Sequence, residues 1–318
     1  MLWIDWNRWF HSGKKQKNER VSGSGDDMTH WFKAVLLYLL PHHALSRIVQ
    51  WSTRCRRFPF RKAITRRFIR HYNVNMSEAL EPDPNAYPDF NSFFTRALRP
   101  EARPVVQEAG QICFPADGAI SQLGDIQGTQ IFQAKGHSYS LIELLGGSEE
   151  RAQPFLGGRF ATTYLSPGDY HRVHMPLSGH LMEMMYIPGR LFSVAPDYTE
   201  SAPRLFARNE RIACVFQTEA GPMAVILVGA IFVGSIETVW EGEITPPRGK
   251  RIEVKSYVSD DSVTRLERGE ELGRFNMGGS TVIVLFGPGC AEWQTGLEPE
   301  MRVQFGQALG RVQQGKPQ

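Results

Sequence analysis

The hydrophobic pattern of the chain changes near residue 111. Before that point, apolar residues recur at roughly helical spacing among basic ones, and the apolar stretch 31–40 predicts a short helix that ends at a proline. After it, short runs rich in β-branched residues, such as 224–228 and 281–286, alternate with Gly, Pro and Asp-Gly breakers. The pattern predicts an α+β protein in which N-terminal amphipathic helices are followed by a compact, mainly β domain.

Four segments follow from this pattern. Residues 1–27 combine tryptophans, lysines and a Ser-Gly-Ser-Gly stretch without the apolar region of a signal peptide, and we expect them to be a disordered extension. Residues 28–72 contain the predicted helices, residues 73–110 form a connector, and residues 111–318 form the β-rich domain. Within the connector, residues 89–96 predict a short helix capped by Asp89 or Asn91.

Charge is distributed unevenly along the chain. The 36 Lys and Arg and 33 Asp and Glu give a net charge of +3, but the stretch from His42 to Tyr72 has nine basic and no acidic residues. The other 287 residues therefore carry 27 basic and 33 acidic groups, a net charge of −6. Aromatic and aliphatic residues lie between the basic ones, which suits amphipathic helices on an anionic membrane surface.

Two other interpretations of the basic segment remain at this point. Its apolar residues could pack on the protein's own core, with the arginines merely solvated. The segment could also bind nucleic acid, but the acidic body offers no continuation of the basic track, so we expect no nucleic-acid partner.

Composition narrows the class of protein further. Apolar residues make up 42% of the chain and charged residues 22%, which is enough for a sizeable core. The apolar run 34–40 has only seven residues, far fewer than the roughly 18 of a membrane-spanning helix. The four cysteines have no CxxC spacing, which favours free thiols in a reducing compartment: Cys55, Cys113, Cys214 and Cys290.

Three places in the β-rich region contain residues suited to catalysis. Asp117 precedes a glycine, and Asp-Gly is most often a hairpin turn. His171 and His174 are three residues apart, which fits a catalytic histidine, a structural one or part of a metal site, although HExxH and a cysteine pair are absent. Ser280 follows two glycines, where the chain either turns into a strand or exposes a carbonyl to the adjacent hydroxyl.

Taken together, these motifs make the sequence resemble one family, the phosphatidylserine decarboxylases of the bacterial membrane-associated type. The resemblance runs in the family's order from about residue 30 to 290 and does not cover residues 1–27. Its matching stretches are Phe-Asn-Ser-Phe-Phe-Thr-Arg-Ala-Leu-Arg at 90–99, Phe-Pro-Ala-Asp-Gly-Ala-Ile-Ser-Gln-Leu-Gly at 114–124, Tyr-His-Arg-Val-His-Met-Pro at 170–176 and Gly-Ser-Thr at 279–281, with others at 135–141, 188–194, 205–211, 228–230 and 233–240.

The resemblance implies that the chain cuts itself between Gly279 and Ser280. In the family, the serine attacks the carbonyl of the preceding glycine, the amide becomes an ester, and elimination leaves a pyruvoyl group in place of the serine. The family's Asp–His–Ser triad falls on Asp117, His174 and Ser280. A large chain of 279 residues and a small chain of 39 residues would result.

The resemblance also implies the activity, the cofactor and the partners. The pyruvoyl group derived from Ser280 is the covalent cofactor, and no metal is required. Its ketone condenses with the amine of phosphatidylserine, and phosphatidylethanolamine and CO2 are the products. The family links the first histidine of the pair, here His171, to decarboxylation, a step to which a group with a near-neutral pKa is suited.

The lipid substrate gives the basic helices a role at the membrane. We expect a peripheral protein on the cytoplasmic face of the bacterial cell membrane, with residues 28–72 as docking helices and residues 111–318 as the catalytic domain. A homo-oligomer is an open option. The family commonly has leucine where this chain has Gly278, and we expect the extra glycine to loosen the loop.

Three other activities stay open. A metallohydrolase would use His171 and His174 as ligands, a membrane-docking adaptor would only bind lipid, and a pyruvoyl enzyme acting on a soluble amino acid would not need the basic helices.

Overall fold

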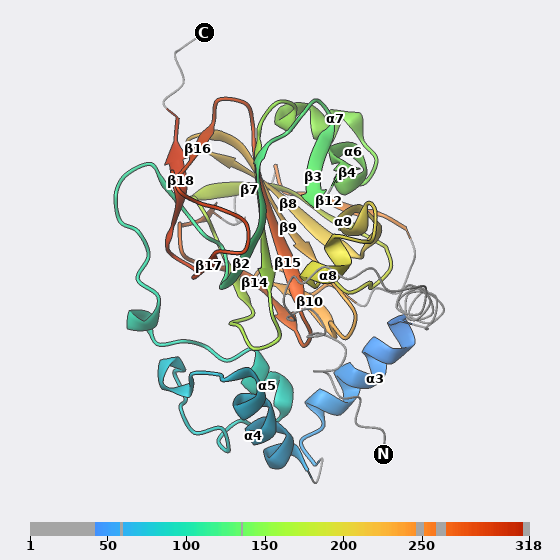
Figure 1. Ribbon diagram of the computed structural model, residues 1–318, viewed down its shortest axis with the longest axis vertical. Helices are drawn as coiled ribbons and strands as arrows, with labels where there is room; N and C mark the ends of the chain where they lie inside the picture. The colour runs from blue at the N-terminus through green and yellow to red at the C-terminus, as the bar shows by residue number, and fades with distance from the viewer. Residues whose placement is uncertain (1–41, 58–59, 135, 246–250, 259–264, 314–318) are drawn as a thin grey trace, which may run out of the picture. The chain divides into compact units, whose positions relative to one another are not determined.

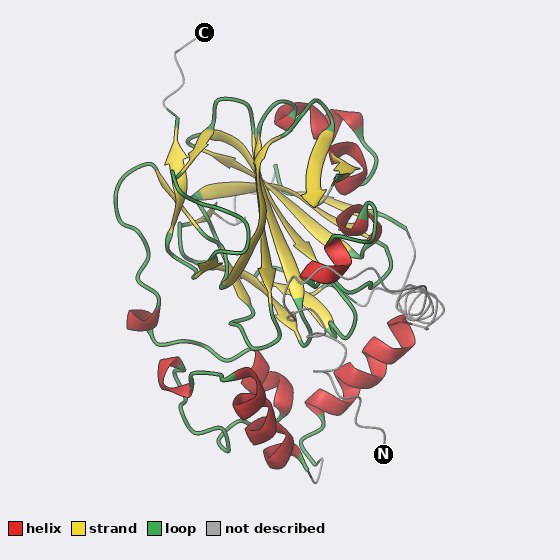
Figure 2. Cartoon of the chain, in the orientation of Figure 1, coloured by secondary structure: helices red, strands yellow, loops and turns green. Residues whose placement is uncertain are grey.

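The computed structural model describes residues 42–57, 60–134, 136–245, 251–258 and 265–313. The predicted helix at 31–40 and the expected extension at 1–27 lie outside these ranges. Helices come first along the described chain and strands dominate the rest (Figures 1 and 2), which confirms the predicted α+β class. Within these ranges, no helix has the length and apolar character needed to cross a membrane.

The first two described helices differ in what covers them. Helix α3 (His42–Arg54) leaves Ile48 62% and Trp51 70% exposed. Helix α4 (Arg61–Tyr72) instead packs its apolar residues, including Phe68, against the connector. The alternative in which the helices pack on the protein's own core is therefore correct for α4 but not for the exposed side of α3.

The connector is folded around aromatic side chains. It contains the 3₁₀-helix η1 (Met76–Glu78), helix α5 (Phe90–Phe94) and the 3₁₀-helix η2 (Pro100–Ala102). Asp89 is the cap of α5, because its carboxylate accepts the Ser92 backbone N–H at 2.8 Å. Four buried residues form what we call the aromatic cluster, on which α4 packs: Val74, Phe90, Phe93 and Phe94.

One large antiparallel sheet forms the centre of the β-rich region (Figure 1). Its central strand β15 (Ser280–Phe286) is buried along its whole length, as its unbroken apolar run predicts. In sheet order the strands are β12 (Glu253–Ser256), β7 (Gly179–Ile187), β8 (Arg211–Thr218), β9 (Gly221–Val228), β15, β5 (Arg159–Leu165), β2 (Gly118–Asp125) and β17 (Arg302–Val303), and β13 (Arg265–Leu266) also pairs with β7.

Smaller sheets and short helices surround this sheet. One sheet has the order β11 (Gly242–Glu243), β10 (Ser235–Thr238), β14 (Glu271–Asn276) and β6 (Arg172–His174). A second has the order β1 (Gln111–Cys113), β18 (Ala308–Val312) and β16 (Ala291–Trp293), and β3 (Gln130–Ala134) pairs with β4 (His137–Ser140). The short helices are α6 (Leu141–Leu144), α7 (Glu149–Ala152), η3 (Gln153–Phe155), α8 (Pro196–Thr199) and α9 (Leu205–Arg208).

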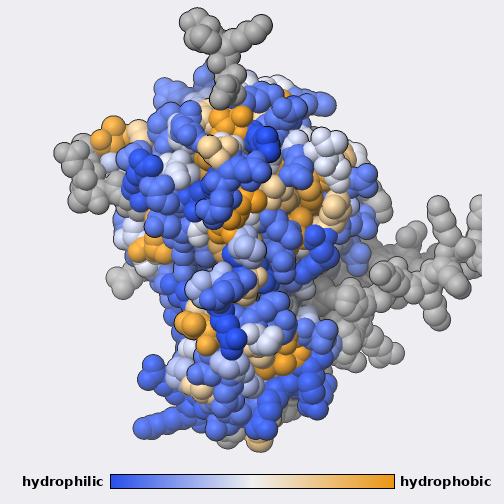
Figure 3. All heavy atoms as spheres, turned by 90° about the vertical axis from the view of Figure 1, so that its left-hand side faces the viewer, coloured by the Kyte–Doolittle hydropathy of each residue, from blue (hydrophilic) through white to orange (hydrophobic). Residues whose placement is uncertain are grey.

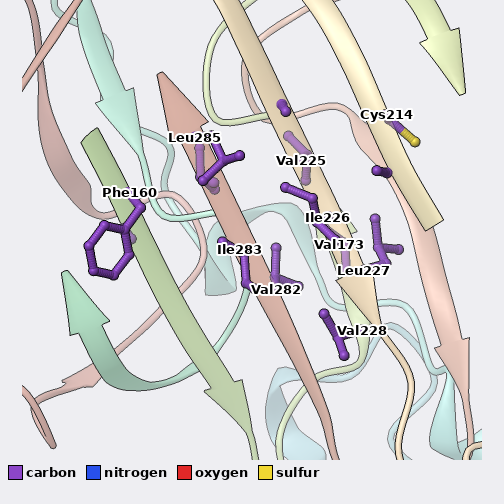
Figure 4. Close-up of a cluster of buried hydrophobic side chains, with 14 of the residues drawn as sticks. Phe160, Val173, Cys214, Val225, Ile226, Leu227, Val228, Val282, Ile283 and Leu285 are labelled. Atoms are coloured by element: carbon purple, nitrogen blue, oxygen red, sulfur yellow. The ribbon is translucent and has the colours of Figure 1, made fainter. Parts of the chain in front are cut away.

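The hydrophobic core lies on the central strands. Figure 4 shows side chains of β9 and β15, among them Ile226, Val282 and Ile283, beside Phe160 of β5 and Cys214 of β8. These residues are almost completely buried. On the face shown in Figure 3, hydrophilic residues predominate and hydrophobic ones form separate patches. The four cysteines, Cys55, Cys113, Cys214 and Cys290, are free.

Candidate active site

Ser280 and Asp117 lie at the same end of the two strands that flank β5 in the large sheet. Ser280 begins β15 and pairs with Leu165, the last residue of β5. Asp117 directly precedes β2, which runs antiparallel to β5. Because β2 pairs with β5 and β17, and β1 pairs with β18, Asp117–Gly118 is not the turn of a hairpin. The fold therefore brings together residues that are 163 positions apart in the sequence.

The loop 277–279 connects β14 to β15 in a constrained conformation. Met277 and Gly278 both have positive φ angles, 72° and 90°. A Cβ atom on Gly278 would lie 2.7 Å from the Val233 backbone nitrogen and 2.8 Å from the Phe232 carbonyl carbon. Glycine is therefore required in this backbone arrangement. We expected Gly278 to loosen the loop, but the structure packs the loop closely against its neighbours.

The Ser280 hydroxyl is buried and unpaired. The residue has no exposed surface, and its Oγ has no hydrogen-bond partner among the described residues. Buried polar atoms without partners are rare and cost free energy, which makes them candidates for a functional role. Gly279 precedes it, and a Cβ atom placed there would lie 3.7 Å from Pro167 Cδ. The Gly279–Ser280 peptide thus lies beside the loop that precedes His171.

His171 lies next to this loop, fully buried. Its ring stacks on Phe94 of the aromatic cluster with 4.1 Å between ring centroids. Its Nε2 is 3.3 Å from the Pro167 carbonyl oxygen, while its Nδ1 has no partner in the described ranges. Burial, and then the positive charge of Arg96, lowers the pKa of His171 to about 3. The imidazole is therefore neutral near pH 7, with its proton on Nε2.

His174 lies farther along β6, opposite Glu271 at the start of β14. Its Nδ1 donates to the Gly269 carbonyl oxygen at 2.8 Å, and its Nε2 accepts from the Tyr170 hydroxyl at 3.0 Å. Burial lowers the pKa of His174 to about 4 and raises that of Tyr170, so the ring is neutral and the phenol keeps its proton. Both ring nitrogens of His174 are therefore occupied.

Asp117 is buried in a strong ion pair. Its carboxylate accepts from Arg103 Nε at 3.0 Å and Nη2 at 2.6 Å, and from the Phe305 backbone N–H at 2.9 Å. Arg103 also contacts Glu78 at 2.8 Å. The Phe305 ring stacks on His174 with 3.6 Å between centroids. Asp117 and His174 therefore share Phe305 as a neighbour.

The structure gathers the proposed triad in one region but does not join it by hydrogen bonds. No described bond links Asp117 to His174, and none reaches the hydroxyl of Ser280. A relay through His174 would require its ring to leave Gly269 and Tyr170. His171 shares a neighbour with the Gly279–Ser280 peptide, because Pro167 contacts the His171 ring and lies 3.7 Å from the Cβ position of Gly279.

A polar cavity of about 540 Å³ adjoins this region. Asp117, Tyr170 and the loop segment 166–169 contribute to its walls, together with Arg96, Arg103 and Arg302. Sequence reasoning missed Arg96, Arg103, Tyr170, Phe94 and Phe305. Phe94, Arg96 and Tyr170 lie within the matching motifs, but no sequence pattern indicated that their side chains are buried beside the candidate residues.

The two histidines are not arranged as a pair of metal ligands. His171 stacks on Phe94, whereas His174 stacks on Phe305 and uses both ring nitrogens. In the part of the chain that the structure describes, no group of three or more His, Cys, Asp and Glu side chains is placed to hold a metal ion.

Comparison with known proteins identifies a family that the chain matches over most of its length. The family model described as phosphatidylserine decarboxylase matches residues 90–311, and a model described as PSD matches residues 32–73. The phosphatidylserine decarboxylase proenzyme of Alkalilimnicola ehrlichii is 61% identical over 253 residues, covering 80% of this chain and 87% of that protein.

Two further proenzymes of the same name extend the match. The protein of Pseudomonas fluorescens is 57% identical over 277 residues, covering 86% of this chain and 96% of its own length. That of Methylococcus capsulatus is 56% identical over 277 residues, covering 87% and 95%. A match of this extent, together with the motifs gathered at one sheet edge, shows that the chain belongs to the phosphatidylserine decarboxylase family.

Proposed function

We propose that this chain is a self-processing, pyruvoyl-dependent decarboxylase that converts phosphatidylserine to phosphatidylethanolamine and CO2. Family membership supports the reaction. The observation that carries the self-processing is the buried Ser280 hydroxyl, which has no partner among the described residues and lies two positions after the constrained Gly278. A hydroxyl in such a place has no structural bond to lose when it attacks the neighbouring carbonyl.

Self-cleavage would proceed within the loop. The Ser280 Oγ attacks the Gly279 carbonyl carbon and its proton passes to a base. The base returns this proton to the amide nitrogen, which leaves as an amine, so that an ester is formed. Removal of the Cα proton of residue 280 then breaks the Cβ–Oγ bond and releases Gly279 as a carboxylate, and water hydrolyses the resulting dehydroalanine to the ketone with release of ammonia. A neutral imidazole is needed as the base, and both His171 and His174 meet this condition at pH 7.

We assign the relay to Asp117, His174 and Ser280, as the family resemblance implies. In this assignment, His174 exchanges its contacts with Gly269 and Tyr170 for contacts with the carboxylate and the hydroxyl. The negative charge of Asp117 favours the protonated ring that forms when His174 takes up the proton. Phe305, which touches both residues, would guide the ring during this exchange.

The site fits a pyruvoyl group because the group would occupy the buried position that Ser280 holds now. When present, this group supplies a ketone that withdraws the electrons of the departing carboxylate. The chain's own contribution is a buried position for the group and a positioned histidine. His171 has a free Nδ1 beside the same loop, so we assign to it the transfer of a proton during decarboxylation.

The two chains would stay together after cleavage. The small chain, residues 280–318, begins with β15, which pairs with β5 and β9 of the large chain on either side. Strands β17 and β18 pair with β2 and β1 of the large chain. Separating the chains would break these ladders and expose the buried side chains of β15.

We also propose that the protein docks peripherally on the cytoplasmic face of the bacterial cell membrane. The exposed Ile48 and Trp51 of α3 support this proposal. A hollow of about 740 Å³ beside α4 combines the apolar Ala63, Ile69 and Met76 with Arg66 and Arg70. Such a surface suits acyl chains and anionic head groups. Reduced sedimentation of Trp51→Ser with phosphatidylglycerol vesicles, but not with phosphatidylcholine vesicles, would support docking, and unchanged sedimentation with both would contradict it.

Self-cleavage is tested on a denaturing gel and by mass spectrometry. The wild type should give two fragments, with a blocked keto terminus on the fragment that starts at position 280. Ser280→Ala should stay intact. Thr281→Val is the matched control, because Thr281 is the next buried hydroxyl without a partner in the described structure and points to the opposite face of the strand. An active wild type that remains one intact chain would refute the proposal.

Three further variants test the assigned roles. Asp117→Ala and His174→Ala should each remain uncut, whereas His171→Ala should be cut and decarboxylate slowly. Release of carboxyl label from serine-labelled lipid distinguishes the enzyme from a lipid-binding adaptor. Activity that disappears with a chelator would instead favour a metallohydrolase.

A further inference from the structure

Arg96 is a buried cation that forms no ion pair with a carboxylate in the part of the chain that the structure describes. It follows α5, and only 5% of its surface is exposed. Its Nη2 is 3.5 Å from the Gly168 carbonyl oxygen, and its guanidinium carbon lies 5.5 Å from the centre of the Phe93 ring. Its Nε and Nη1 have no hydrogen-bond partner within the described ranges.

This arrangement is costly for the folded protein. A buried charge normally requires a partner of opposite charge and hydrogen bonds for its donors. The single contact to a neutral carbonyl is at the outer limit of a hydrogen bond and cannot compensate for the lost hydration. Burial accordingly lowers the pKa of Arg96. A bound anion would supply the opposite charge and the hydrogen-bond acceptors that the side chain lacks.

The other two arginines of the polar cavity are already paired. Arg103 binds Asp117 and Glu78, and Arg302 binds Asp169. The three acidic residues of the cavity wall are therefore engaged with these two arginines. Arg96 is left as the cation of this wall with no carboxylate within ion-pair distance among the described residues.

Arg96 lies between the polar cavity and the segment that contacts His171. Arg96 contacts the Gly168 carbonyl, and the carbonyl of the preceding Pro167 contacts His171. Pro167 also lies beside the scissile loop, as described above. The segment 166–169 thus separates the guanidinium from the reacting residues by the thickness of one loop. An anion held by Arg96 would lie close to the reacting carbon without being the group that reacts.

We propose that Arg96 binds the phosphodiester group of the lipid substrate at the polar cavity. This inference rests on the decarboxylase function proposed above. Phosphate is favoured over the substrate's carboxylate, because a cation that stabilises the carboxylate would oppose its loss as CO2. The phosphate is unchanged by the reaction and remains in the product. A guanidinium with unpaired donor nitrogens is suited to charge-assisted hydrogen bonds with phosphate oxygens.

The test compares Arg96→Met and Arg96→Lys with Arg99→Met, an exposed arginine of the same segment, as the matched control. Each protein is first checked for complete cleavage. In detergent micelles containing phosphatidylserine, Arg96→Met should raise KM roughly tenfold to hundredfold with kcat nearly unchanged, the loss expected for a charged hydrogen bond made equally in ground and transition states. Arg96→Lys should recover part of the loss, and Arg99→Met should behave as the wild type.

Competition and stability separate phosphate binding from a structural role. Glycerophosphoethanolamine should inhibit the wild type more strongly than the Arg96→Met variant, inorganic phosphate should do so more weakly, and L-serine should not inhibit through this site. Without ligand, Arg96→Met should unfold at the same temperature as the wild type or higher, because an uncompensated buried charge is removed. A purely structural role predicts a lower unfolding temperature.

The outcomes that overturn the proposal are distinct from failure of the enzyme function. A cleaved Arg96→Met protein with wild-type KM, or equal inhibition of both proteins by glycerophosphoethanolamine, would overturn it. Should Arg96→Met not fold, a wild type that glycerophosphoethanolamine inhibits no better than L-serine would do the same. If the wild type itself releases no CO2, the proposed function fails instead, and thermal protection by glycerophosphoethanolamine still tests the phosphate site.

Discussion

Gly278 provides a direct test of the loop geometry, through the substitution Gly278→Ala. The residue has a φ angle of 90°, and the added Cβ atom would lie 2.7 Å from the Val233 nitrogen. Gly128 is a matched control, because its φ angle is 58° and no heavy atom lies within 4 Å of its Cβ position. Both substitutions introduce a side chain into the left-handed region, but only the first also introduces a clash with backbone.

The expected costs follow from these two contributions. The left-handed conformation costs an alanine about 1–2 kcal/mol, which applies at both positions. Crowding against backbone that cannot move away adds about 1–3 kcal/mol at position 278 alone. For a folded unit of this size, that difference corresponds to an unfolding temperature roughly 2–12 °C lower for Gly278→Ala than for Gly128→Ala.

The comparison is made on uncut protein. Both substitutions are introduced into the Ser280→Ala background, so that every sample is one chain and differences in processing do not enter the unfolding curves. In the Ser280 background, the same Gly278→Ala change should slow self-cleavage, measured as the fraction of cut chain over time. Equal unfolding temperatures for the two alanine variants, with equal cleavage rates, would show that the loop does not have the constrained geometry described here.

Three other predictions concern the neighbours of the site. The free energy of unfolding should fall as the pH drops from about 6.5 towards 4, because the unfolded chain takes up protons on His171 and His174 while burial lowers the pKa of each in the folded protein. The slope is up to about 1.4 kcal/mol per pH unit per histidine. A His171→Asn variant whose stability falls as steeply with pH as that of the wild type would contradict this. Phe94→Leu should reduce kcat about tenfold by releasing the His171 ring, whereas Phe68→Leu, which changes a ring packed against the same cluster, should not. Equal kcat values for the two variants would show that Phe94 does not position His171. Arg103→Met should lower the free energy of unfolding, measured in urea, by about 3–5 kcal/mol, because the buried Asp117 carboxylate loses its ion-pair partner. The Arg103→Met/Asp117→Leu double variant should recover most of the lost free energy. A double variant less stable than Arg103→Met would show that the loss does not come from the unpaired carboxylate.

The sequence predicted the class of the fold from local patterns. The runs at 224–228 and 281–286 became the adjacent strands β9 and β15, and the short helix after Asp89 formed where its cap predicted. These elements depend on periodicity and capping, which are properties of neighbouring residues. The interpretation of Asp117–Gly118 as a hairpin turn was wrong, because local turn preference does not contain the long-range pairing of β2 with β5.

The candidate site could be named from the sequence only through family resemblance. Ser280 and Asp117 meet because β15 and β2 flank the same strand, and no local pattern specifies the order of strands in a sheet. The burial of Arg96 could not be predicted from the sequence either. Its motif contains an arginine after two phenylalanines, yet only the packed aromatic cluster shows that the guanidinium is enclosed without a carboxylate.

The two histidines are held by different numbers of hydrogen bonds, which suits the different reactions assigned to them. His174 is held on both nitrogens and His171 on one, so the described conformation favours the residue assigned to decarboxylation over the residue assigned to cleavage. For His174 to act, it must give up two hydrogen bonds, each with a net value of about 1 kcal/mol. That cost is small beside a reaction barrier, and it is recovered when the ring returns. Self-cleavage happens once in the life of a molecule, whereas decarboxylation recurs at every turnover. A fold that keeps His171 in place and requires His174 to move only once accommodates both reactions around position 280.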